Sequence, residues 1–133
     1  MDFNKSRSVP FEITDISHGL QELKGLVSLS KKGFELEFEV QDSLIGFFKS
    51  GITNLTIPFS DLESITYKKG WFGGKVILEG TSMKVFEDLP GAELATCTLK
   101  IKRKHRDEAE KLISSARMRF SEYKLNELDD DQQ

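Results

Sequence analysis

The clearest pattern in the chain is an alternation of apolar and acidic residues over residues 34–40. Every second position is apolar, and the three residues between these positions are all Glu. The apolar residues are Phe34, Leu36, Phe38 and Val40. A period of two predicts a strand that buries one face and leaves the other in water. We therefore expect a half-buried strand here, with an acidic outer face.

Residues 23–30 predict a second strand just before the first, so that the two form a β-hairpin. Lys31, Lys32 and Gly33 make the short loop between them, and Gly33 is expected to supply a positive φ. In this second strand, the side chains expected to face inward are those of Leu23, Val27 and Leu29.

Further short strands are predicted along the chain, separated by turns rich in Gly, Pro and Asp. Pro58 places its strand at a sheet edge or ends that strand, because proline donates no ladder hydrogen bond. The spacing of Ser60 and Glu63 is that of a capping box and predicts one helical turn. The strands are expected at residues 55–59, 64–69, 75–79 and 95–102, with 82–86 as a further candidate.

An amphipathic helix is predicted after Arg106. Its apolar residues recur at the spacing of one helix face, and acidic residues precede basic ones, as the helix dipole favours. The apolar positions are Ala109, Leu112, Ile113, Ala116, Phe120 and Tyr123.

Strands followed by one helix, without βαβ alternation, predict an α+β fold: a strongly bent antiparallel sheet or barrel of six to seven strands, capped by the C-terminal helix. We expect an N-terminal extension at residues 1–19, a folded domain at 20–124 and an acidic, disordered tail at 125–133. The sequence leaves open whether the first nineteen residues add a strand or trail free.

The segment from Ile57 to Ile65 (Ile-Pro-Phe-Ser-Asp-Leu-Glu-Ser-Ile) resembles the I-P-x-x-[DE]-I-x-S-[IV] pattern of uncharacterised bacterial pleckstrin-homology-like (PH-like) proteins. Residues 68–78, 87–92 and 103–113 also resemble that class, so the similarity covers about residues 23–120. The resemblance implies a seven-stranded bent sheet with a helix plugging one opening. It also implies binding of phosphoinositides or peptides, or oligomeric scaffolding.

Phosphoinositide-binding members of the class carry a basic hairpin between their first two strands. Here that hairpin is reduced to Lys31, Lys32 and Gly33, and three Glu follow on the outer face of the next strand. This departure argues against phosphoinositide binding through that hairpin.

Composition narrows the class of protein further. The 133 residues suffice for one domain, and 19 Lys and Arg against 22 Asp and Glu disfavour a broadly basic nucleic-acid binder. The single cysteine, Cys97, excludes an internal disulfide. Apolar runs are far shorter than the ~20 residues that span a bilayer, and the first residues lack the apolar core of a secretory signal. We expect a cytoplasmic protein.

A basic run holds five Lys or Arg in the seven positions 100–106. It could form an anion-binding patch for lipid headgroups. Alternatively, it is a solvated strand end that pairs with the acidic face of residues 35–39, within the chain or across a subunit interface. Nucleic acid is disfavoured because no row of exposed aromatic residues accompanies it. The basic residues are Lys100, Lys102, Arg103, Lys104 and Arg106.

A turn at residues 70–74 places Trp71 and Phe72 among three glycines. Exposed, the two rings could enter a membrane interface or anchor a protein partner; otherwise one ring folds back over the barrel. A second apolar cluster, residues 44–49, is either a self-association patch or part of the core. The lysines that flank the turn are Lys68, Lys69 and Lys75.

The sequence shows no arrangement of residues that is typical of an enzyme active site. His18 and His105 lie in unlike regions, and Cys97 occupies an inward strand position. Glu35 and its neighbours on the same strand face are spaced by ~6.5–7 Å, too far apart for joint chelation of a metal ion. We therefore expect no catalytic residue, no metal and no cofactor.

Two main functions follow from these candidates, and a small hydrolase is a third, less favoured alternative. The first is a non-enzymatic binding or assembly module that uses the Trp71 turn, the neighbouring lysines or both, toward a protein partner or a second copy. The alternative is a peripheral membrane adaptor that binds anionic headgroups through residues 100–106.

Overall fold

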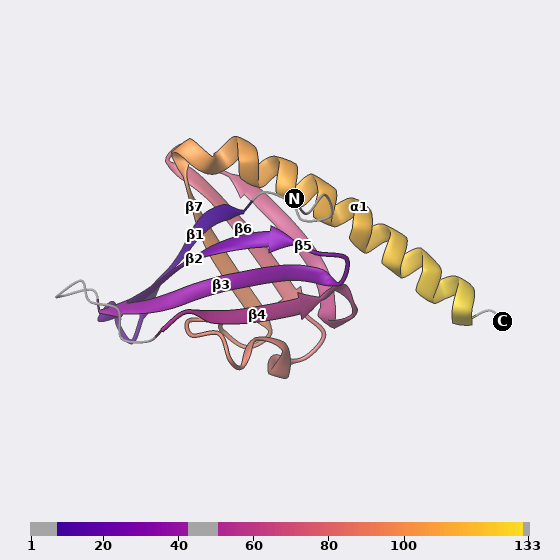
Figure 1. Ribbon diagram of the computed structural model, residues 1–133, viewed down its shortest axis with the longest axis horizontal. Helices are drawn as coiled ribbons and strands as arrows, with labels where there is room; N and C mark the ends of the chain where they lie inside the picture. Colours follow the sequence, from indigo (N-terminus) through magenta and orange to yellow (C-terminus); the bar gives the residue numbers. More distant parts are fainter. Residues whose placement is uncertain (1–7, 43–50, 132–133) are drawn as a thin grey trace.

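The computed structural model describes residues 8–42 and 51–131. The apolar cluster at residues 44–49 lies outside the described residues. The described chain forms one seven-stranded antiparallel sheet and one long C-terminal helix, which confirms the α+β fold class (Figure 1). In chain order the elements are β1 (Val9–Ile16), β2 (Gln21–Leu29), β3 (Gly33–Asp42), β4 (Thr53–Pro58), η1 (Phe59–Asp61), β5 (Leu62–Lys69), β6 (Gly73–Gly80), η2 (Met83–Phe86), β7 (Thr96–Lys102), η3 (Arg103–His105) and α1 (Arg106–Asp131).

The strand order is β4-β3-β2-β1-β7-β6-β5, so β1 lies at the centre of the sheet. Our expectation of an extension over residues 1–19 is corrected here, because residues 9–16 pair with β2 on one side and β7 on the other. The alternation of Val9, Phe11 and Ile13 with polar residues and proline explains this, since all three side chains are buried. Residues 82–86 hold a 3-10 turn rather than a strand, so the count of seven strands is reached with β1.

The β2–β3 hairpin forms as predicted, and its expected inward residues from Leu23 to Phe38 are buried. Gly33 does not have the positive φ that we expected. Instead, a Cβ at this position would lie 2.1 Å from the Ile57 carbonyl oxygen of β4. The glycine is needed because the edge strand β4, which ends at Pro58, approaches the backbone of β3 closely.

This close approach predicts the effect of Gly33→Ala. The added methyl group must push β4 away, so the free energy of unfolding should fall by about 1–3 kcal/mol. Urea unfolding checks the value, and Gly51→Ala is the control because a Cβ at Gly51 meets no atom within 4 Å. Equal stability of the Gly33→Ala variant and the parent would contradict the packing described.

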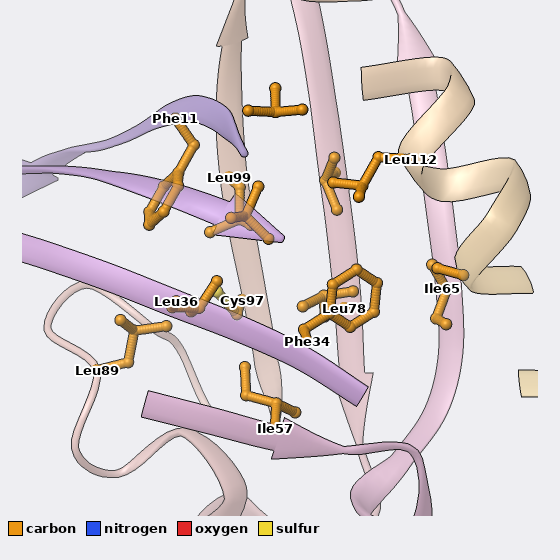
Figure 2. Close-up of a cluster of buried hydrophobic side chains, with 14 of the residues drawn as sticks. Phe11, Phe34, Leu36, Ile57, Ile65, Leu78, Leu89, Cys97, Leu99 and Leu112 are labelled. Atoms are coloured by element: carbon orange, nitrogen blue, oxygen red, sulfur yellow. The ribbon is translucent and has the colours of Figure 1, made fainter. Parts of the chain in front are cut away.

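The sheet folds back on itself, so that β2, β3 and β4 cross in front of β5, β6 and β7 (Figure 1). Side chains of Phe34 and Leu36 point from one layer toward Leu78 and Cys97 of the other, and Leu112 of α1 closes the cluster (Figure 2). The hydrophobic core therefore lies between the two layers and beneath the first half of α1.

Helix α1 ties the two layers together. The Nε of Arg117 donates to the Ile65 carbonyl of β5 at 3.1 Å, and Nη1 of Arg119 donates to the Ser30 carbonyl after β2, also at 3.1 Å. Phe120 packs on Phe59 with ring centroids 6.2 Å apart. The helix then continues to Asp131, so the expected disordered tail from residue 125 is helical through residue 131. Its last turns project beyond the strands (Figure 1).

Of the two local predictions near β5, the strand is confirmed and the capping box is wrong. The strand at residues 64–69 is present as β5, extended by two residues at its start. The helical turn is present as η1, but it begins at Phe59 and has no side-chain cap hydrogen bond, so the capping box is not formed.

Candidate functional site

The β5–β6 hairpin presents two aromatic residues to solvent. Trp71 is 75% exposed and Phe72 is 86% exposed. The turn beneath them closes through a hydrogen bond from Gly70 N to Gly73 O of 2.7 Å. Such a tight turn holds the two residues at the tip, beyond the ends of both strands. Of the two interpretations of this turn, the structure selects the exposed one over the barrel cap.

The basic run after β7 packs against this tip. The guanidinium carbon of Arg103 lies 5.9 Å from the ring centroid of Trp71, a cation–π contact. Nη1 of Arg106 donates to the Gly70 carbonyl at 2.6 Å. Since Gly73 of β6 is registered opposite Lys102 of β7, the turn and the basic run are neighbours by strand pairing as well. The fold thus joins two sequence candidates into one surface.

Three lysines form a row across the outer face of the layer that β5, β6 and β7 make. Lys68 of β5 is registered opposite Lys75 of β6, which is opposite Lys100 of β7. Like charges directly opposite each other destabilise a sheet. At one end of the row Lys100 lies opposite Glu12 of β1, so the repulsion that an anion would relieve is mainly that between Lys68 and Lys75.

Lys69 has a different place, because it faces α1 rather than the outer surface. Its Nζ lies 3.5 Å from Asp107 Oδ1 and 3.7 Å from Glu110 Oε2. Beside it, the Tyr67 hydroxyl donates to the Arg106 carbonyl at 3.0 Å. Burial raises the pKa of Tyr67, and the nearby Glu110 carboxylate raises it further, so the hydroxyl remains a donor at neutral pH. Lys69 and Tyr67 fix the hairpin on the helix.

The acidic partner of the basic run is Glu12 of β1. Its carboxylate lies 3.5 Å from Lys102 Nζ, and Glu12 is registered opposite Lys100 and opposite Lys24 of β2. Glu35 accepts hydrogen bonds from the Ser30 and Thr56 hydroxyls instead, at 2.8 and 2.5 Å. Lys100 donates to the Thr14 hydroxyl. Lys102 of the basic run thus pairs with β1, while Glu35 of the acidic face of β3 bonds neighbouring hydroxyls.

Sequence reasoning missed Glu12 and Lys24 as members of the charged surface. Both side chains gain their significance only because β1 lies between β2 and β7. The signal that could have found them is the apolar alternation at Val9, Phe11 and Ile13, which was assigned to an extension.

The residues considered for catalysis are not brought together. His18 lies in the turn after β1, and His105 lies in η3 near the start of β1, so the whole strand separates them. Cys97 is buried, and this burial raises the pKa of its thiol to about 12, which keeps it protonated at neutral pH. Residues 8–42 and 51–131 contain no group of three or more His, Cys, Asp or Glu that could hold a metal ion.

A comparison of the chain with protein-family models, curated proteins and solved structures finds no match. The seven-stranded sheet with its C-terminal helix is consistent with a PH-like topology. No helix within the described part of the chain is both long and apolar enough to cross a membrane.

Proposed function

We propose that this protein is a non-enzymatic binding module of PH-like fold that docks on an anionic membrane surface through its β5–β6 hairpin. The observation that carries the proposal is the exposure of Trp71 and Phe72 at the tip of a hairpin flanked by cations. An indole ring suits the boundary between headgroups and acyl chains, because it is apolar in body and has one polar N–H.

Charge around the tip favours a negatively charged surface. No acidic residue occurs in the sequence between Glu63 and Glu79, or between Glu93 and Asp107, and the Asp107 and Glu110 carboxylates beside the hairpin pair with Lys69. The outward lysines Lys68 and Lys75 and the stacked Arg103 lie beside the rings. A cation near an anionic leaflet contributes about 1 kcal/mol. The apolar rings and the cations would therefore act in the same direction.

Co-sedimentation with vesicles tests this proposal. We expect the chain to pellet with vesicles that contain phosphatidylglycerol, not with pure phosphatidylcholine, and to be released as salt rises. The double variant Lys68→Gln/Lys75→Gln should weaken binding by about tenfold or more, at ~1 kcal/mol for each charge.

Lys31→Gln/Lys32→Gln is the matched control, since it removes two exposed lysines elsewhere. Their loop lies near α1 at Arg119, whereas the hairpin contacts α1 at Arg106, about 20 Å away along the helix. Equal losses from the two double variants would contradict a localised site. Absence of vesicle binding together with salt-resistant multimers on a sizing column would favour self-association instead.

A further inference from the structure

A basic cavity of about 250 Å³ opens on the outer side of the sheet, beside the hairpin but separate from its tip. It lies where β2, β1 and β7 run next to each other and where η3 leaves the end of β7. The charged and polar side chains that line it are Glu12, Lys24, Lys100, Lys102, Lys104 and His105.

Cations outnumber anions around this cavity. The lining contains four lysines and one carboxylate, that of Glu12, and two more carboxylates lie beside Lys24, because Glu22 pairs with it and Glu39 of β3 is registered opposite it. Glu12 lies 3.5 Å from Lys102 and is registered between Lys24 and Lys100, so it holds the lysines in place while neutralising only one charge. Lys24 has a further partner in Glu22, at 3.7 Å. The arrangement leaves an excess of positive charge in a concave site, which attracts an anion.

His105 also lines the cavity, so its imidazole ring can report on a bound group. Its Nδ1 is buried and has no hydrogen-bond partner within the described chain, so a ligand in the cavity reaches that atom only if the side chain moves.

The size of the cavity limits the ligand. Sites for drug-sized molecules measure about 300–1,000 Å³, so a cavity of about 250 Å³ suits one small charged group rather than a nucleotide. A phosphate group fits this description, because its oxygens accept short, charge-assisted hydrogen bonds from several lysines at once.

We propose that this cavity binds the phosphate group of a phosphomonoester. The group could belong to a lipid headgroup or to a soluble metabolite. This inference does not rest on membrane docking by the hairpin, since the cavity is built from β1, β2, β7 and η3 and includes neither tip ring.

The two histidines of the chain make a direct test, because His105 lines the cavity and His18 lies beyond the other end of β1. Proton NMR of the full chain follows both imidazole rings during titration with inorganic phosphate at fixed pH and fixed ionic strength. We expect a saturable shift of the His105 resonances, no shift of those of His18, and no shift when chloride replaces phosphate.

The variant Lys24→Gln/Lys104→Gln should bind phosphate at least about tenfold more weakly, since two charged donors are lost. The Lys31→Gln/Lys32→Gln variant should bind phosphate as the parent does. A thermal melt confirms that each variant is folded. Trp71→Ala/Phe72→Ala should retain phosphate binding even if it no longer binds vesicles, which separates this inference from the proposed function.

Two further probes distinguish the sources. Saturable binding of glycerol 3-phosphate, without a preference for phosphatidic acid vesicles over phosphatidylglycerol vesicles, supports a soluble ligand. Preference for phosphatidic acid vesicles over phosphatidylglycerol vesicles, lost in Lys24→Gln/Lys104→Gln, supports a lipid headgroup. The proposal is overturned if no phosphate probe gives a saturable shift of His105, or if the Lys31→Gln/Lys32→Gln control weakens phosphate binding equally.

Discussion

Replacing both tip aromatics, as Trp71→Ala/Phe72→Ala, should weaken binding to anionic vesicles by about a hundredfold or more. Burial of one large apolar side chain contributes about 1.5–3 kcal/mol, and each 1.4 kcal/mol is a factor of ten in affinity. Both rings project from the protein, so this contribution is made only when the hairpin meets a partner surface. Co-sedimentation measures the change.

The same variant should fold as stably as the parent, because exposed substitutions usually change stability by within about 0.5 kcal/mol. Met83→Ala/Leu94→Ala is the matched control, since both side chains are exposed. Leu94 lies far from the tip, at the other end of β6. The carbonyl of its neighbour Ala95 accepts a hydrogen bond from the N–H of Gly80, the last residue of that strand. Retained vesicle binding by Trp71→Ala/Phe72→Ala would show that the rings are not the anchor.

Phe34→Ala should have the largest effect on stability, a loss of about 3–5 kcal/mol in the free energy of unfolding. Phe34 is fully buried between the two layers and meets the Phe59 ring edge-on, with centroids 6.2 Å apart. Removing its ring leaves a cavity that rigid strands on both sides cannot fill. Small domains have only about 5–15 kcal/mol of stability, so the variant should be close to unfolding at room temperature.

Urea unfolding of Phe34→Ala and Phe72→Ala measures the effect of the same change, Phe to Ala, at a buried site and at an exposed site. We expect the midpoint to fall sharply for Phe34→Ala and to stay nearly unchanged for Phe72→Ala. A loss below about 1 kcal/mol at Phe34 would be incompatible with a core closed between the layers.

The parts of the fold that the sequence predicted are those with a long, regular period. Residues 34–40 alternate without interruption, and α1 repeats its apolar positions over several turns, so both patterns report burial directly. β1 was missed because its alternation is short and contains Pro10, a residue that is rare in central strands. The sheet tolerates Pro10 because the registered pairing of β1 with β7 is at Glu12, two residues after the proline.

The candidate site was predictable only in pieces. The residues of the hairpin and of the basic run stood out by composition, but their contact depends on β6 pairing with β7. Exposure of Trp71 is decided by what lies beneath a turn, which no local pattern encodes. The cavity required the order β2-β1-β7, which brings Lys24, Glu12 and Lys100 side by side from distant parts of the chain.

Trp71 is the single tryptophan of the chain and lies at the proposed point of contact, so its fluorescence tests the central claim most directly. With 75% of its surface exposed, it should emit at the long wavelengths of an indole in water. Addition of phosphatidylglycerol-containing vesicles should shift the emission to shorter wavelengths, and pure phosphatidylcholine vesicles should not. Unchanged emission in the presence of vesicles that demonstrably bind the protein would contradict insertion of the hairpin tip.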